Sequence, residues 1–139
     1  MTIPPGRLPV DFVVSGVPAS SQGANRARKA AWTRAVRTAA ENAWKAPPLD
    51  TKVRVIIRHY GRGGRVPDVD NMAKPILDAI TGTVWVDDRQ VESCDTGRAD
   101  LDGAYRVSGI SMVLAKGFFQ DEPFTYVKIL ELTDQELLP

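Results

Sequence analysis

Apolar and polar residues alternate along several short stretches of this 139-residue chain, which is the period expected of β-strands. The alternation is clearest at residues 51–60, where Val53, Val55 and Ile57 fall on one face. The sequence LDGA at residues 101–104 predicts a hairpin turn between two strands. The other predicted strands cover residues 10–17, 90–98, 106–115 and 124–132.

Two further stretches follow the period of an α-helix. Over residues 26–45, Trp32, Val36 and Ala40 form an apolar row, and the two prolines that follow end the helix. Residues 70–80 predict a shorter helix, which ends at Gly82. Strands, helices and turns in this order predict an α+β fold, in which two main helices pack on a small mixed or antiparallel sheet.

The second helix contains Pro75, which a helix interior does not favour. We expect this helix to begin near Asn71, because the proline then falls where backbone N–H groups lack helical partners. Asn71, Lys74 and Asp78 share one face of such a helix. The apolar residues predicted to enter the core on the other side are Met72, Ile76, Leu77 and Ile80.

Length and composition indicate one ordinary globular domain over residues 1–139. The apolar runs are too short to span a bilayer, and the first residues lack the pattern of a signal peptide. The single cysteine, Cys94, excludes an intrachain disulfide and suits a reducing compartment. We therefore expect a cytoplasmic protein with no membrane partner.

Positive and negative charges are separated along the chain, although the net charge is only +1. Residues 1–65 hold twelve Lys or Arg and three Asp or Glu, whereas residues 66–139 hold six and fourteen. Such a split is typical of a chain with a polyanionic partner, but two surfaces that attract each other produce it equally well. The basic half is a candidate phosphate-binding surface, and the acidic half is a candidate metal site.

Acidic residues are concentrated in the middle of the chain. Asp68 and Asp70 form one pair, Asp87 and Asp88 form a second, and Lys74 lies on the helix between them. Crowded carboxylates repel one another, so a fold that gathers them usually holds a cation. Mg²⁺ prefers such hard oxygen ligands together with substrate phosphates. If the pairs converge, the sequence predicts a magnesium site suited to phosphodiester hydrolysis.

Each acidic pair also has a structural interpretation. An Asp before a helix is a common cap, and Asp-Asp-Arg is typical of a turn. The Asp-x-Asp pair lacks the glycine and the glutamate that a calcium-binding helical loop requires. His59, the only histidine, fits an incidental surface position better than a phosphate contact. No Ser-His-Asp set, zinc-type Cys-His spacing or P-loop occurs in the sequence.

Two motifs in this region resemble those of the RusA family of Holliday junction resolvases. They are DVDNMAKPILDAI at residues 68–80 and DDRQV at residues 87–91, and they agree with the family in residue type and order. The resemblance implies a RusA-like fold and a homodimeric, Mg²⁺-dependent endonuclease, with Mn²⁺ as an alternative ion. Such an enzyme nicks four-way DNA junctions symmetrically during recombination and repair.

The resemblance also implies roles for individual residues. The catalytic metal ligands correspond to Asp68, Asp70 and Asp88, with Asp87 close by, and the family's lysine corresponds to Lys74. Apart from the resemblance, the helical spacing gives Asn71 and Asp78 supporting positions on the same face as Lys74. The opening loop, VPASSQGANRARKAAW, differs from the proline- and asparagine-rich loop of the best-known members.

Basic residues of the first helix and of the GRGGR loop are the predicted contacts with the DNA backbone. They are Arg26, Arg28, Lys29, Arg34, Arg37, Arg62 and Arg65. A nucleic-acid-binding module that keeps the fold without turnover is the main alternative to a nuclease. A phosphoryl or glycosyl transferase that uses the Asp-x-Asp pair is weaker, because the sequence has no glycine-rich nucleotide signature.

Overall fold

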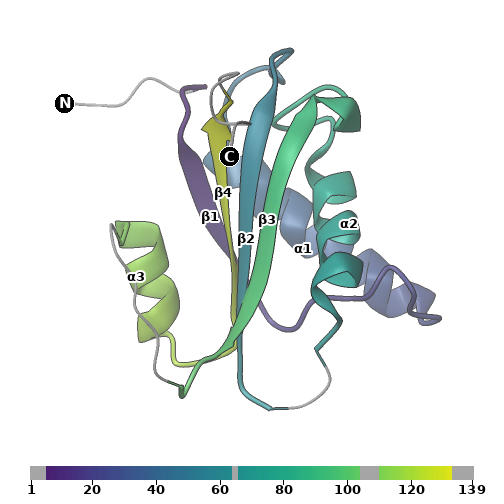
Figure 1. Cartoon of the computed structure of the whole chain (residues 1–139), viewed down its shortest axis with the longest axis vertical. Coiled ribbons are helices and arrows are strands. Elements are labelled where there is room, and N and C mark those ends of the chain that lie inside the picture. Colours follow the sequence, from purple (N-terminus) through teal and green to yellow (C-terminus); the bar gives the residue numbers. More distant parts are fainter. Residues whose placement is uncertain (1–5, 64–65, 104–109, 133–139) are drawn as a thin grey trace.

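The sheet at the centre of the protein has four strands in the order β1-β4-β2-β3 (Figure 1). The computed structural model describes residues 6–63, 66–103 and 110–132. β4 is antiparallel to both of its neighbours, whereas β2 and β3 are parallel, so the predicted α+β fold with a mixed sheet is confirmed. The strands are β1 (Val10–Ser15), β2 (Val53–Gly61), β3 (Val91–Asp100) and β4 (Phe124–Glu131).

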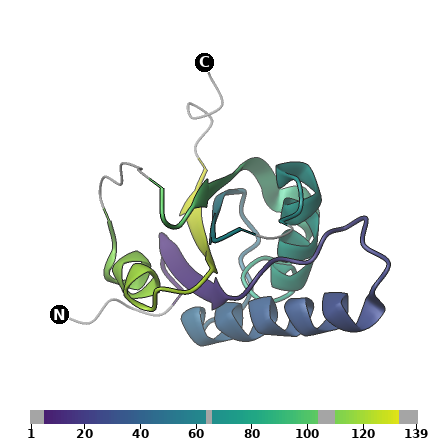
Figure 2. The ribbon, with the colours of Figure 1, turned by 90° about the horizontal axis from the view of Figure 1, so that it is seen from below.

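Two helices, α1 (Arg26–Ala43) and α2 (Val69–Ile80), pack on one face of this sheet (Figure 1, Figure 2). The predicted apolar face of β2 is fully buried beneath them. The predicted row of α1, which includes Trp32, enters the same core, and so does Trp44, directly after the end of the helix. Side chains that alternate along β2 thus decide which face the helices cover.

A third helix, α3 (Met112–Phe119), packs against β1 and β4. Its Leu114 joins a second cluster with Phe124 and Tyr126, whose side chains point away from the first core. Gly117 allows the close approach, because a Cβ there would lie 2.7 Å from the Phe124 ring. The helix therefore covers part of the face that α1 and α2 leave open.

The predicted strand at residues 106–115 is wrong where it can be compared, because residues 112–115 belong to α3. Ser111 begins the helix by accepting a hydrogen bond from the Leu114 N–H at 3.1 Å, and tertiary burial of Leu114 favours helix over strand. The rest of that prediction, residues 104–109, lies outside the described residues.

The predicted hairpin at residues 101–104 is also wrong. Residues 101–103 do form a turn, in which the Gly103 N–H donates to the Asp100 carbonyl at 2.9 Å. However, β3 pairs with β2, and the chain continues through α3 to β4 on the other side of β2. The turn therefore ends a strand without joining two paired ones.

The expected start of α2 near Asn71 is wrong, because the helix begins at Val69. Pro75 therefore lies in the helix interior and has no N–H to give to the Asn71 carbonyl, four residues earlier. That carbonyl instead accepts a hydrogen bond from the Ser21 N–H at 2.9 Å. The proline fits because the loop before α1 takes the place of the missing helical donor.

The helices formed by the described residues do not combine the length and apolarity that crossing a membrane requires. The longest of them, α1, has 18 residues and carries several charged side chains.

Candidate metal and DNA-binding site

Asp68 and Asp70 lie at the amino-terminal end of α2. Asp68 is the N-cap residue by position, but its side chain makes no capping hydrogen bond and is 77% exposed. Asp70 is exposed in the first turn and accepts a hydrogen bond from the Asn71 N–H at 3.1 Å. The positive end of the helix dipole favours negative charge at this position. Both carboxylates are therefore accessible to a ligand.

Asp87 and Asp88 lie at a short 3₁₀ helix, η1 (Asp88–Gln90), immediately before β3. Asp87 caps this helix by accepting from the Arg89 N–H at 2.9 Å, and that hydrogen bond lowers the pKa of the Asp87 carboxyl. Gln90 completes the cap and donates to the Leu49 carbonyl at 2.7 Å. Asp88 is exposed, so it is the member of this pair that is better placed for a ligand.

Asp68 and Asp70 lie at the start of α2, whereas Asp87 and Asp88 follow its other end, where the chain turns into β3 (Figure 1 shows α2 beside β3). A helix of 12 residues is about 18 Å long. Asp68 is also 4.0 Å from Arg98, near the end of β3, whereas Asp88 precedes Val91 at its beginning. The strand covers about 23 Å between Val91 and Arg98. The convergence that the sequence permits therefore does not occur within a single chain.

The described residues contain no group of three or more His, Cys, Asp or Glu side chains placed to hold a metal ion. A single chain thus presents two separate acidic pairs, one at each end of α2.

Lys74 and Asp78 lie on the exposed side of α2, as the helical period predicts. The Lys74 ammonium is 3.3 Å from the Asp78 carboxylate, and both side chains are more than half exposed. Exposed pairs of this kind are weak, so a phosphate can compete for the lysine. Asn71 is instead held by the loop before α1, because its side-chain oxygen accepts from the Ser21 hydroxyl at 3.1 Å.

The basic residues of α1 lie at the protein surface, where Lys29 is half-buried and the others are exposed. Within the described part of the chain, Arg26 and Arg34 have no hydrogen-bond or ion-pair partner, so their charges face solvent alone. The remaining three hold nearby backbone. Their acceptors are the carbonyls of Val17 and Pro18 for Arg28, of Ser21 for Lys29 and of Ala79 for Arg37.

Arg62, the other described member of the predicted basic set, is engaged with carboxylates. Its guanidinium donates to both oxygens of Asp102 at 2.7 and 2.8 Å and to Asp121 at 2.6 Å. The hydrogen bonds to Asp102 and Asp121 raise its pKa further. Arg62 thus connects the end of β2 with two other loops. Arg65 lies outside the described residues.

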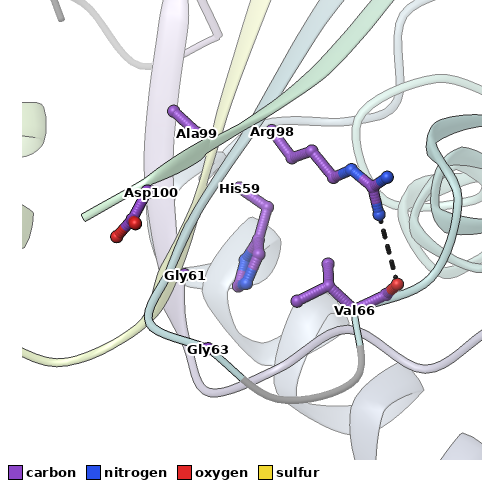
Figure 3. A pocket seen from close by; sticks show the side chains of 7 residues that line it. All are labelled: His59, Gly61, Gly63, Val66, Arg98, Ala99 and Asp100. Carbon is purple, nitrogen blue, oxygen red and sulfur yellow. Dashed lines mark hydrogen bonds between the residues drawn. The ribbon is translucent and has the colours of Figure 1, made fainter. Parts of the chain in front are cut away.

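A pocket of about 330 Å³ lies beside the segment that leads into α2 (Figure 3). His59 lines it, and the expected surface position of this residue is wrong, because it is 1% exposed. Its Nδ1 lies 2.9 Å from the Thr125 hydroxyl, and its Nε2 has no partner among the described residues. Burial lowers the pKa of the ring to about 4, so His59 is neutral at pH 7.

Arg98 is the residue of this region that the sequence did not single out. Its guanidinium donates to the carbonyls of Val66 at 3.2 Å and Pro67 at 3.1 Å, directly before Asp68 (Figure 3 shows the first of these). In the sequence it is the last residue of the strand predicted at residues 90–98, which also carries Glu92 and Asp95. Arg98 is about 30 residues from Val66 and Pro67 in the sequence, and only the folding of the sheet brings it near them.

A comparison of the sequence with known protein families identifies the family of this chain. The family model described as endodeoxyribonuclease RusA matches residues 18–129, which include α1, α2, η1 and β3. No curated protein matches the chain. The matched region contains both acidic pairs, Lys74 and the basic residues of α1. The chain therefore belongs to the RusA family of endodeoxyribonucleases, which carries nuclease activity of the Holliday junction resolvase type.

Proposed function

We propose that this protein is an Mg²⁺-dependent endonuclease that nicks four-way DNA junctions at two symmetric positions in recombination and repair. The observation that carries the proposal is the pair of exposed carboxylates, Asp68 and Asp70, at the amino-terminal end of α2. They belong to a chain of a nuclease family whose members generally depend on divalent metals.

The residues at this end of α2 fit a hard divalent ion. Asp68 and Asp70 offer exposed carboxylate oxygens, which suit Mg²⁺ and also Mn²⁺. A bound ion of this kind neutralises phosphate charge and lowers the pKa of water. Lys74, one turn further along the helix, is positioned to stabilise the charge that develops as one P–O bond forms to water and another breaks.

Two copies of the chain complete the proposed site. The half-sites at the two ends of α2 are too far apart to share one ion, because Mg²⁺ binds its ligands at about 2.1 Å. A two-fold dimer in which the helices run in opposite directions brings Asp88 of a second copy toward Asp68 and Asp70 of the first. It also creates two equivalent sites, which paired symmetric nicks require. Asp87, which is occupied as a cap, supports Asp88 in this arrangement.

A mixing experiment tests the shared site. Asp70→Asn and Asp88→Asn are each expected to be inactive as homodimers. A mixed dimer contains one site with all three carboxylates and one site with neither Asp70 nor Asp88. Mixing the two variants under conditions of subunit exchange is therefore expected to restore single nicks but not paired nicks. A mixture that remains inactive although mixed dimers form contradicts the shared site.

The basic residues of α1 form the proposed DNA-contact surface. Arg26 and Arg34 have no partner among the described residues, and Arg28, Lys29 and Arg37 add charge while they hold backbone carbonyls. Phosphate contacts of this type release counterions, so affinity falls steeply with salt. We do not include Arg62 among the strongest contacts, because two carboxylates already surround it.

Cleavage of a synthetic four-way junction, with and without Mg²⁺, tests the proposed activity. Asp70→Asn is expected to abolish cleavage and to keep junction binding, because the change removes a ligand charge without altering α1. Glu122→Gln, which neutralises an exposed carboxylate in the loop before β4, is the matched control and should cut normally. Full Mg²⁺-dependent cleavage by Asp70→Asn would contradict the proposed role of Asp70 as a metal ligand.

A nucleic-acid-binding module without turnover is the second candidate, and the separation of the two half-sites in one chain favours it if the chain is monomeric. Junction binding without cleavage under Mg²⁺ or Mn²⁺, by a protein that sediments as a monomer, would support this function instead.

A further inference from the structure

We propose that Arg98 is a positioning residue for Asp68, which it orients by holding the two residues before it. This inference rests on the proposed function, because it concerns how the half-site at the start of α2 is kept ready for a metal ion. Arg98 itself lies on β3, in a different layer of the fold from the helix that it serves.

The contacts of Arg98 converge on one short segment. A single guanidinium nitrogen donates to the carbonyls of Val66 and Pro67, and a second lies 4.0 Å from the Asp68 carboxylate. These carbonyls precede α2, so the hydrogen bonds of the helix do not fix them. Arg98 thus holds backbone that the secondary structure leaves without support.

The conformation of Asp68 explains why such support matters. Its backbone is extended, with φ −59° and ψ 153°, and its side chain does not cap the helix. Asp residues at this position commonly turn inward and accept from the helix amides. An Asp68 that points outward keeps its oxygens for a ligand. Fixing Val66 and Pro67 restricts the rotation that would let the carboxylate fold back onto the helix end.

The strand that carries Arg98 is supported by its neighbours in the sheet. Arg98 lies opposite His59 in the β2–β3 register, and the buried His59 ring contacts the Thr125 hydroxyl on β4. The arginine therefore projects from a sheet that is anchored across three strands. Its planar fork, with several donors in fixed directions, suits two carbonyls and a carboxylate better than a flexible lysine does.

Hydrogen exchange of the metal-free protein tests the positioning role directly. The Met72 N–H donates to the Asp68 carbonyl at 2.9 Å, so its exchange reports on the first turn of α2. Arg98→Ala is expected to accelerate this exchange. Arg58→Ala is the matched control, because Arg58 pairs with Asp95 at 3.2 Å on the same strands and does not touch Val66–Asp68. Equal exchange at Met72 in both variants overturns the proposal.

Metal binding supplies the second measurement. Mn²⁺ titration of the full chain, followed by electron paramagnetic resonance, is expected to show affinity about 10- to 100-fold weaker in Arg98→Ala, as is common when a residue that orients a metal ligand is lost. Arg98→Lys should restore part of the affinity, and Arg58→Ala should leave it unchanged. An unchanged Mn²⁺ affinity in Arg98→Ala overturns the proposal.

A cleavage assay distinguishes a failure of this inference from a failure of the proposed function. Arg98→Ala is expected to need a higher Mg²⁺ concentration for half-maximal junction cleavage and to bind the junction normally. If the wild-type protein binds Mn²⁺ but cuts no junction, the proposed function fails, while weaker Mn²⁺ binding by Arg98→Ala still supports the role of Arg98. If Arg98→Ala loses junction binding to the same extent as Mn²⁺ binding, its role is general folding and the proposal is wrong.

Discussion

Ser21 contacts Asn71 with both of its hydrogen-bond donors: its N–H donates to the Asn71 carbonyl at 2.9 Å, and its hydroxyl donates to the Asn71 side-chain oxygen at 3.1 Å. The first bond exists because Pro75 has no N–H to offer that carbonyl. The loop that leads into the basic helix is thereby attached to the helix that carries Asp70. The proposed DNA-contact surface and the proposed metal half-site are thus connected through one residue pair.

Removing the Ser21 hydroxyl tests this connection. Ser21→Ala is expected to lower the free energy of unfolding by about 0.5–1.5 kcal/mol, the net contribution of one hydrogen bond. Urea denaturation measures the change. Ser20→Ala is the control for position in the loop, because the Ser20 hydroxyl contacts the Gln22 N–H and not α2. The junction affinity of Ser21→Ala should fall more than that of Ser20→Ala, and equal affinities would argue against the connection.

Salt dependence of junction binding distinguishes free from occupied arginines. Arg34→Ala is expected to reduce the slope of log affinity against log salt concentration by about one, because it removes a phosphate contact. Arg62→Ala is expected to change the slope less, because Asp102 and Asp121 already neutralise that guanidinium. Fluorescence anisotropy over a range of salt concentrations measures both slopes. A larger change for Arg62 than for Arg34 would contradict the proposed surface.

The buried His59 predicts a pH dependence of stability. Burial lowers its pKa from 6.5 to about 4, so between these values the unfolded chain binds a proton that the folded chain does not. The contribution of His59 is therefore complete above pH 6.5, falls as the pH drops toward 4, and then levels off. Urea denaturation at several pH values should show His59→Gln losing less stability than the wild type across this window. Parallel curves for the two proteins would exclude a role for His59.

The contact between Gly117 and Phe124 predicts the effect of a methyl group. Alanine is favoured over glycine in a helix by about 1 kcal/mol. However, a Cβ at position 117 would lie 2.7 Å from a ring atom of Phe124, which is fully buried and has little room to move. Gly117→Ala is therefore expected to destabilise the fold by about 1–3 kcal/mol. Urea denaturation checks the sign, and a variant more stable than the wild type would show that the ring can move aside.

Local patterns in the sequence were sufficient for most of the fold. Val53, Val55 and Ile57 repeat with the period of a strand, and Trp32, Val36 and Ala40 repeat with that of a helix, because burial on one face imposes that spacing. The region around α3 could not be predicted in this way. Met112 to Ala115 are apolar and suit a strand or a helix equally, and the fit of Gly117 against Phe124 favours the helix.

The candidate site, like the fold, could be predicted from the sequence only in part. The sequence by itself determined which residues are candidates for the chemistry, because carboxylates, a lysine and arginines have their charges wherever the chain places them. Only the tertiary structure decided how they are arranged: Asp68 and Asp88 lie at opposite ends of α2, Arg62 is already paired, and Arg98 supports the segment before Asp68. The physical reason is that a spacing along the chain limits how far apart two residues can be, while the path of the helix and strand between them sets how far apart they are.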